Sequence, residues 1–236
     1  MTYFLIYKLS NGIIVNSESN KQHFIDIAHI SPKHIRVIYN GIDASEYIVE
    51  KNLSKNRGGK FQIGFIGRLS IEKGVIYLIE ALSQLTEIDY ECVIIGEGPL
   101  RYVLEEKVLS KGLKSRIKFL GFQKNVTPFF AQMDVFILPS LNEVLPITII
   151  EAFALKVVTI AAEVGGVPDL ITHGKTGMLY PTRDIEKLSE NIKWVYKNNS
   201  ESQKMVENAY AKFIQSFSSD VMIREISEYF DIINKN

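Results

Sequence analysis

The chain has 236 residues, 46% of them hydrophobic, and its 27 lysine and arginine residues balance 27 aspartate and glutamate residues. This size suits one large domain, or one domain with a fragment of a second, and the absence of net charge gives no field that would recruit nucleic acid or an anionic membrane. One cysteine excludes an internal disulfide, and four scattered histidines argue against a zinc site.

Short β-branched or apolar segments alternate along the chain with longer amphipathic segments, which predicts strands alternating with helices. Because such strands form parallel sheets covered on both faces, we expect a doubly wound, Rossmann-like α/β domain with ligands at the carboxyl ends of its strands. The expected strands are residues 11–17, 34–41, 61–67, 90–96, 116–121, 134–140 and 157–163, and the expected helices are residues 17–29, 73–86, 99–111, 126–132, 146–155, 167–172, 184–198, 201–216 and 220–234.

A polar, basic segment at residues 49–60 ends in two glycines and is typical of a linker. The residues before it supply two strands and one helix, which is too little to support a core of its own. We therefore expect them to pack on the rest of the chain or on another chain.

Two basic residues follow the expected strand at residues 61–67. Gly67 allows the chain to turn sharply, so Arg68 and Lys73 stand at the carboxyl end of the strand, where the next helix also begins. An arginine fork and a lysine ammonium can together neutralise a diphosphate without a metal. Taken by itself, the segment fits a solvated loop with surface cations equally well.

A second informative segment, "SLNEVLPITIIEAFA", follows the apolar strand at residues 134–140. We expect a helix with Pro146 in its first turn and Asn142 or Glu143 near its cap, so that its positive end faces the strand ends. Glu143 and Glu151 are eight residues apart, ~12 Å if helical throughout, and could grip two ends of one polar ligand. A glutamate near a helix start is often only a cap, but Glu151 lies in an apolar run and needs a partner, such as a ligand hydroxyl.

The segments "GRLSIEKG", "VIIGEGPLR", "IKFLGF", "LPSLNEVLPITIIEA" and "VGGVPDLITHGKTGMLY" occur in this order through residues 61–190. Together they resemble the signatures of the retaining, GT-B fold glycosyltransferases of group 1 type, which use nucleotide-sugar donors. The segment "VIYNGIDASEY" at residues 37–47 resembles the connection between the two domains of that family. The glycines of "GEGPLR" do not complete a dinucleotide fingerprint, which argues against a nicotinamide cofactor.

The resemblance assigns roles to particular residues. Arg68 and Lys73 would hold the donor diphosphate, Glu151 would bind the ribose hydroxyls and Glu143 would face the donor sugar. Val144 stands where the family commonly has glycine or serine, which makes the role of Glu143 less secure than that of Glu151. The resemblance thus gives Glu143, Arg68 and Lys73 as catalytic candidates, and Arg68, Lys73, Glu151, Gly121, Phe122, Gly67 and Leu145 as donor-binding candidates, with the backbone at Gly121 and Phe122 bordering the base.

The resemblance also predicts how the chain is organised. Residues 1–58 would be a remnant of an amino-terminal acceptor domain with its linker, residues 59–216 the donor-binding domain, and residues 217–236 a terminal helix that crosses back to the remnant. Without the rest of the acceptor domain, apolar residues of the remnant are expected to form an exposed patch, which marks self-association or a partner chain. They are Phe4, Leu5, Ile6, Tyr7 and Leu9. The partner is either a second copy, giving a homodimer, or a separate amino-terminal half.

The implied chemistry is transfer of a sugar from a nucleoside diphosphate to an acceptor hydroxyl with retention, in polysaccharide or glycolipid synthesis, with no cofactor or metal beyond the donor. The alternative is a non-catalytic nucleotide-sugar binding module that self-associates or needs a partner chain, so the chain by itself is either an enzyme or an inactive half. Hydrolysis by Glu143 and Glu151 is disfavoured, because hydrolytic carboxylates flank a scissile bond rather than a nucleotide. No apolar segment approaches the ~20 residues of a membrane span, and we expect a cytoplasmic protein, free or peripheral at the inner face of a membrane.

Overall fold

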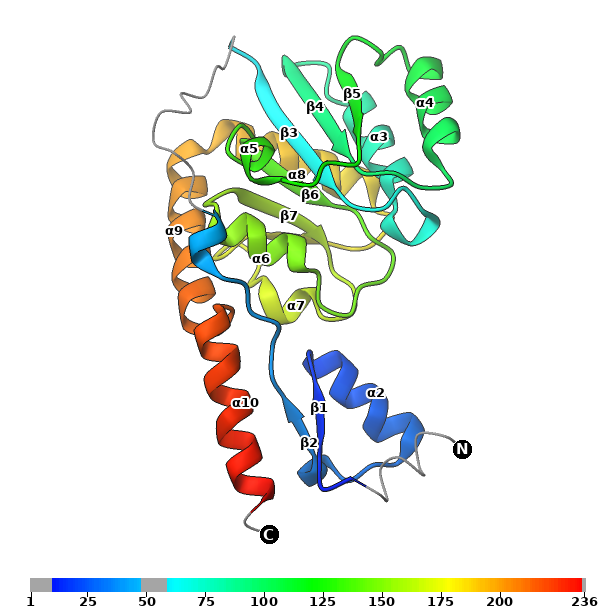
Figure 1. Cartoon of the computed structure of the whole chain (residues 1–236). Coiled ribbons are helices and arrows are strands. Elements are labelled where there is room, and N and C mark those ends of the chain that lie inside the picture. Colours follow the sequence, from blue (N-terminus) through cyan, green and yellow to red (C-terminus); the bar gives the residue numbers. More distant parts are fainter. Residues whose placement is uncertain (1–9, 48–58, 235–236) are drawn as a thin grey trace.

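Six parallel strands in the described part of the chain form one sheet, and helices cover both of its faces (Figure 1). The computed structural model describes residues 10–47 and 59–234. The strand order is β5-β4-β3-β6-β7-β8, which is the doubly wound order of a Rossmann-like domain and confirms the expected fold class. The strands are Phe61–Ile66 (β3), Tyr90–Ile95 (β4), Ile117–Gly121 (β5), Val135–Leu138 (β6), Val158–Ala162 (β7) and Met178–Tyr180 (β8).

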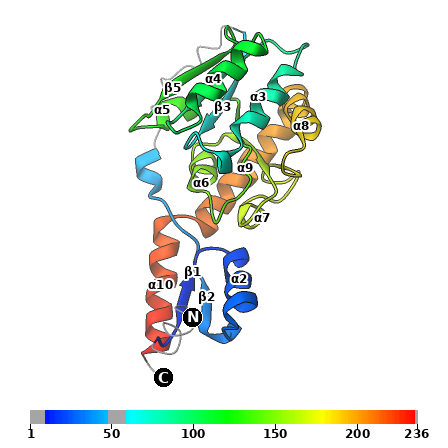
Figure 2. The ribbon, with the colours of Figure 1, turned by 90° about the vertical axis from the view of Figure 1, so that its right-hand side faces the viewer.

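The central strands β6 and β7 are buried along their whole length because helices cover them on both sides. The helices α3 and α8 pack together on one face of the sheet, and α6 lies on the other face, where it packs against α9 (Figures 1 and 2). The helices of this domain are Val75–Ser83 (α3), Arg101–Ser110 (α4), Thr127–Phe130 (α5), Ile147–Ala154 (α6), Val167–Leu170 (α7), Ile185–Lys197 (α8) and Asn199–Ser216 (α9).

Helix α8 illustrates how the local sequence determines where a helix begins and which of its sides is buried. Leu188, Ile192 and Val195 recur at helical spacing and are buried, while the opposite side of the helix is polar. Asp184 caps the helix, because its carboxylate accepts a hydrogen bond from the amide of Lys187 at 2.9 Å. Strand β8 is the element that the sequence pattern did not predict, since its three residues are too few to show a period.

A smaller part of the chain lies beside this domain and consists of β1 (Ile13–Val15), α2 (Glu18–Ala28), β2 (Ile35–Val37) and the terminal helix α10 (Ser219–Ile233). The strands β1 and β2 pair in parallel, and Val15, Ile30 and Ile35 form a small core under α2. Helix α10 runs alongside the two strands (Figure 2), and the hydroxyl of Tyr229 donates a hydrogen bond to the carbonyl of His34 at 3.4 Å. The terminal helix therefore crosses back onto residues 10–47.

The chain passes twice between the two parts, and the two crossings are hydrogen-bonded to each other. The amide of Ile42 donates to the carbonyl of Phe217 at 3.1 Å, and the amide of Ser219 donates to the carbonyl of Ile42 at 2.9 Å. A third contact comes from α2, whose first amide, at Glu18, donates to a carboxylate oxygen of Asp169 at 2.8 Å. The small part is thus tied to the domain through backbone and side chain.

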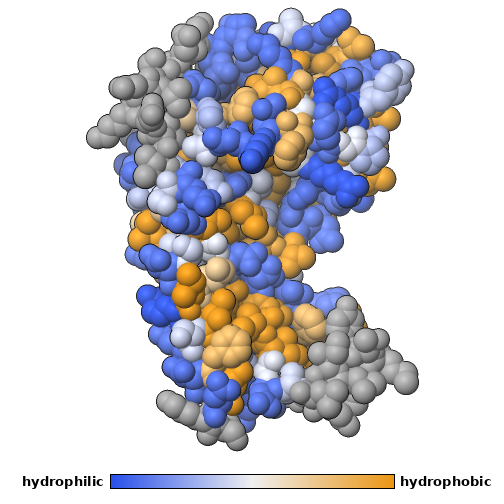
Figure 3. All heavy atoms as spheres, viewed as in Figure 1, coloured by the Kyte–Doolittle hydropathy of each residue, from blue (hydrophilic) through white to orange (hydrophobic). Residues whose placement is uncertain are grey.

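Apolar side chains are exposed on the small part. Figure 3 shows a hydrophobic area over β1, β2 and α10, and Ile14, Ile223 and Phe230 on these elements are 41%, 60% and 50% exposed. We call these three side chains the apolar face. The residues predicted to form an exposed patch, Phe4 to Leu9, lie outside the described residues. Among the described residues, no helix has both the length and the apolar character needed to cross a membrane.

The turn before α3 depends on a glycine at position 74, which we expect a stability measurement to reveal. Gly74 has a φ of 61°, and a Cβ there would overlap the carbonyl oxygen of Pro139, whereas Gly112 has a φ of 68° with nothing within 4 Å. Gly112→Ala should therefore cost ~1 kcal/mol of unfolding free energy from backbone strain, and Gly74→Ala a further ~1–3 kcal/mol from the overlap. Urea unfolding of both variants checks this, and equal losses would contradict it.

Candidate functional site

A cavity of about 460 Å³ opens at the carboxyl ends of β3, β4 and β5. It also reaches α6, which follows β6 on the other side of the point where the strand order reverses. Doubly wound domains bind ligands at this reversal point. The cavity is lined by Ile66, Gly67, Arg68, Ile95, Gly96, Glu97, Phe122, Gln123, Lys124, Val126 and Glu151.

Backbone hydrogen bonds between loops fix the floor of this cavity. The amide of Gly67 donates to the carbonyl of Ile95 at 3.0 Å, and the amide of Gly96 donates to the carbonyl of Gly121 at 2.8 Å. The amide of Leu69 adds a bond of 2.9 Å to the carbonyl of Glu97. The sheet ladder therefore continues past the strand ends, and backbone hydrogen bonds join the three loops to one another.

A second cavity of about 460 Å³ lies at the opposite edge of the sheet, where the strands begin. It contains Lys60 and Lys156 in its lining, but their ammonium groups already contact Glu91 and Glu207, each at 3.1 Å. The amino edge of a parallel sheet is not where such domains bind ligands. We therefore place the functional site at the carboxyl edge.

Arg68 and Glu151 line the same cavity, as the sequence predicts for two groups that face one ligand. Arg68 is exposed in the loop after β3, so its guanidinium can contact an anion. Phe122, which is 75% exposed, and Gly67 belong to the same lining. Gly121 ends β5 next to Phe122 and has a φ of 70°, which turns the chain around the cavity.

Glu151 has a hydrogen-bond partner in the connection from the small part of the chain. The hydroxyl of Tyr47, in the 3-10 turn Ala44–Tyr47, donates to a carboxylate oxygen of Glu151 at 2.9 Å. Burial raises the pKa of Glu151, and the hydrogen bond from Tyr47 opposes that rise. Burial and the nearby carboxylate of Glu151 likewise raise the pKa of Tyr47. The sequence reading missed Tyr47, although it ends the segment "VIYNGIDASEY".

Lys73 and Glu143 contact each other instead of lining the cavity. The ammonium of Lys73 lies 2.6 Å from a carboxylate oxygen of Glu143, and these side chains are 24% and 9% exposed. The hydroxyl of Ser140 donates to the same oxygen at 2.7 Å. The structure thus divides the predicted catalytic residues into Arg68 in the cavity and an ion pair outside its lining.

The expected cap of α6 is wrong, and the expected donor contact of Leu145 stays a prediction. Helix α6 begins at Ile147 with Pro146 at its N-cap and no side-chain cap, so Glu143 neither caps the helix nor lies on it, because its carboxylate bonds Lys73 and Ser140. Leu145 is 6% exposed and belongs to the main hydrophobic core rather than to the cavity lining.

The buried carboxylate of Glu151 should make stability depend on pH. Because burial raises its pKa above the ordinary value of 4.5, the folded chain binds more protons than the unfolded chain between the two pKa values and loses stability as the pH rises through that window. Glu151→Gln removes this loss but keeps an oxygen for Tyr47. We expect the unfolding free energy of E151Q, relative to the unchanged protein, to rise with pH from 4.5 upward and then level off.

Urea unfolding between pH 4 and pH 8 measures this difference, and a constant difference across that range would exclude a raised pKa at Glu151. Tyr47→Phe is the matched variant. It leaves the buried carboxylate without its hydroxyl donor, so it should lower the unfolding free energy by ~1–3 kcal/mol at pH 7.

The chain matches proteins that transfer sugars. The family model described as "Glycosyl transferases group 1" matches residues 49–212, more than half of the chain. An uncharacterised glycosyltransferase of Methanocaldococcus jannaschii is 27% identical over 244 aligned residues, covering 98% of this chain and 62% of that protein. The UDP-Gal:alpha-D-GlcNAc-diphosphoundecaprenol alpha-1,3-galactosyltransferase of Escherichia coli is 27% identical over 243 residues, covering 97% of this chain and 62% of that protein.

Solved structures show the same fold. The Anabaena protein HepE in complex with UDP superposes with a TM-score of 0.89 at 27% identity, covering 94% of this chain and 64% of that chain. The same protein in complex with UDP-glucose gives a TM-score of 0.86 at 28% identity, covering 94% of this chain and 64% of that chain. The chain thus spans about three fifths of the length of these relatives. Its doubly wound sheet is that of the GT-B glycosyltransferases, and the family match places the chain among the group 1 glycosyltransferases.

Proposed function

We propose that this chain is the donor-binding half of a glycosyltransferase that transfers a sugar from a nucleoside diphosphate to an acceptor hydroxyl with retention. The observation that carries the proposal is the cavity at the strand reversal point, which is lined by both an exposed arginine and a half-buried carboxylate, Arg68 and Glu151. The complexes of HepE with UDP and UDP-glucose support a ligand of this class.

The chemistry of the lining residues indicates how the base, ribose and diphosphate would be arranged in the cavity. The guanidinium of Arg68 offers two parallel donors to diphosphate oxygens, and Glu151 can accept hydrogen bonds from the ribose hydroxyls. Phe122, Val126 and Ile95 give an apolar wall that suits the planar base. The base therefore lies toward the loop after β5 and the diphosphate toward the loop after β3.

The Lys73–Glu143 ion pair takes part in the proposed transfer step. During transfer the bond between the sugar carbon and the diphosphate oxygen breaks, a bond from that carbon to the acceptor oxygen forms, and the acceptor proton passes to the departing diphosphate. Negative charge then grows on the leaving diphosphate, which Arg68 and Lys73 stabilise, since fixed cations act most strongly where charge develops. A diphosphate that reaches Lys73 competes with Glu143 for the ammonium, which frees Glu143 to face the sugar.

We further propose that a sugar carried on a lipid, or a growing polysaccharide, is the acceptor. The name of the Escherichia coli relative includes an acceptor sugar joined through a diphosphate to undecaprenol. Such an acceptor would bring the chain to the inner face of a membrane as a peripheral protein of the cytoplasm. The small part places two strands and two helices beside the domain at residues 59–216. The acceptor site would therefore include residues outside that domain.

Donor binding by isothermal calorimetry tests the site. With UDP, GDP, ADP and TDP sugars as probes, Arg68→Ala should weaken the tightest of them about ten- to hundredfold, because one charge-assisted contact is lost. Arg224→Ala is the matched control, since Arg224 lies on α10, half or more exposed and away from the cavity. Unchanged affinity in Arg68→Ala would refute the assignment of the diphosphate site.

A non-catalytic binding module is the second candidate, and the apolar face of the small part favours it. This face needs cover, either from an amino-terminal half or from a second copy of the chain. Binding of the donor sugars without hydrolysis or transfer, with and without added candidate partners, would support this second candidate over the enzyme.

We expect the purified chain to self-associate through the apolar face. Its sedimentation coefficient should rise with concentration, and Ile14→Thr with Phe230→Ser should weaken the association about tenfold or more, since each buried apolar side chain contributes ~1.5–3 kcal/mol. The double variant Tyr102→Ser with Val103→Ser, which removes exposed apolar residues from α4, should behave as the unchanged chain. A monomer at every concentration in all three proteins would contradict self-association.

A further inference from the structure

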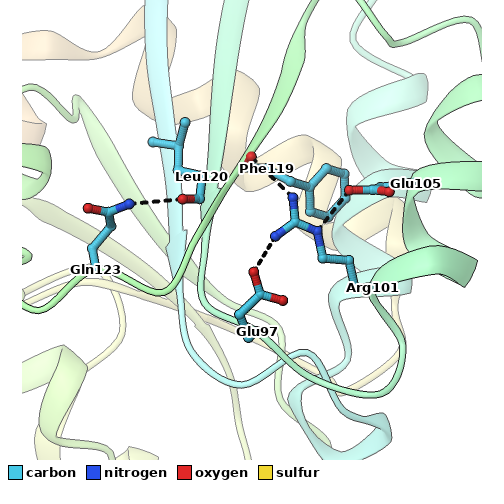
Figure 4. A network of polar contacts seen from close by, with 6 residues as sticks. All are labelled: Glu97, Arg101, Glu105, Phe119, Leu120 and Gln123. Atoms are coloured by element: carbon cyan, nitrogen blue, oxygen red, sulfur yellow. Dashed lines mark hydrogen bonds and ion pairs between the residues drawn. The ribbon is translucent and has the colours of Figure 1, made fainter.

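Arg101, the first residue of α4, joins three elements beside the proposed donor cavity (Figure 4). Its guanidinium forms an ion pair with Glu97 in the turn after β4 and contacts Glu105 at 2.8 Å, one helical turn further along α4. It also donates to the carbonyl of Phe119 in β5 at 3.5 Å and lies 5.7 Å from the centre of the Phe119 ring. The side chain of Arg101 therefore connects α4, β5 and the turn that carries Glu97.

This network lies directly behind the wall of the cavity. Glu97 is part of the lining, and so is Gln123, whose amide group donates to the carbonyl of Leu120 at 2.8 Å. A Cβ at Gly121 would lie 2.9 Å from the carboxylate of Glu97 and 3.5 Å from the guanidinium of Arg101. The glycine thus leaves the space in which the carboxylate of Glu97 meets the guanidinium of Arg101.

The negative charge of Glu97 would disfavour the binding of a diphosphate unless a cation compensated the carboxylate. Its side chain is 52% exposed and that of Arg101 is 31% exposed, so an unpaired carboxylate at this position would repel an anionic ligand across the cavity. Glu105 pairs with the same arginine but does not belong to the lining. Of the two carboxylates that Arg101 holds, only Glu97 therefore bears on ligand binding in the described structure.

We propose that Arg101 is a positioning residue for donor binding, which holds the Glu97 carboxylate neutralised and fixed at the wall of the cavity. This inference rests on the function proposed above, because it concerns the same nucleoside diphosphate ligand. Arg101 acts through Glu97 and does not itself contact the donor. The motif "GEGPLR" then has a function besides its turn: its glutamate forms the wall and its arginine controls the charge of that wall.

The first test compares two variants of the same network. The probe is whichever of UDP, GDP, ADP and TDP the unchanged chain binds most tightly, measured by isothermal calorimetry. Arg101→Met should weaken it about fivefold, the effect expected for losing one partly exposed charge pair, and the loss should shrink in high salt because repulsion is screened. Glu105→Gln, the matched control, removes the other partner of Arg101 and should stay within about twofold of the unchanged chain.

The second test separates charge compensation from simple support of the fold. Adding Glu97→Gln to Arg101→Met removes the uncompensated carboxylate without restoring any packing, so it should recover most of the lost affinity. Glu97→Gln by itself leaves Arg101 and its contact with Glu105 intact, and should bind the probe about two- to fivefold more tightly because the negative charge at the cavity wall is removed.

The outcomes distinguish this inference from the proposed function. If the unchanged chain binds none of the four diphosphates, the proposed function fails and the inference fails with it. If the unchanged chain binds and Arg68→Ala weakens binding, three results overturn the inference and leave the function standing. These are equal losses in Arg101→Met and Glu105→Gln, no recovery in the double variant, and weaker binding in Glu97→Gln.

Discussion

The reversal of strand order between β3 and β6 is the constraint on which the rest of this structure depends. Because all six strands of the sheet are parallel, their carboxyl ends meet at one edge, and the loops after β3, β4 and β5 diverge there from the segment after β6. The backbone bonds of Gly67 and Gly96 then fix these loops against each other. Arg68 and Glu151, separated by more than eighty positions in the sequence, face one cavity for this reason alone.

The two parts of the chain meet at the site as well as at their crossings. Glu151 belongs to α6 of the large domain, and Tyr47, its hydrogen-bond donor, belongs to the connection from the small part. Asp169, near the same edge of the sheet, accepts a hydrogen bond from the first amide of α2. The arrangement of the small part relative to the domain therefore bears on the environment of a residue in the cavity.

Much of this architecture could be predicted from the sequence, because the local signals were strong. The strands are runs of β-branched and apolar residues, and α8 repeats its buried residues at helical spacing, so period and length identified them. Arg68 and Glu151 could be placed together because residues after parallel strands meet at one edge. Strand β8 could not be found, since three residues carry no period.

The remaining features depend on side-chain pairing between distant segments, which no local pattern records. Lys73 and Glu143 are both charged residues near strand ends, and the sequence does not reveal that they neutralise each other at 2.6 Å. The apolar character of Leu145 was visible, but its burial in the core depends on the path of the loop. Tyr47 and Arg101 were missed for the same reason, because each acts through a partner supplied by another element.

The bond between Tyr47 and Glu151 bears on how much affinity this carboxylate would add under the proposed function. The phenol donates to one carboxylate oxygen of Glu151, so a ribose hydroxyl that took the same position would replace one donor with another. Such an exchange would leave the number of hydrogen bonds at that oxygen unchanged, and the gain in affinity would be the difference between two similar donors. Tyr47 would then satisfy a half-buried acceptor until a ligand hydroxyl displaced it.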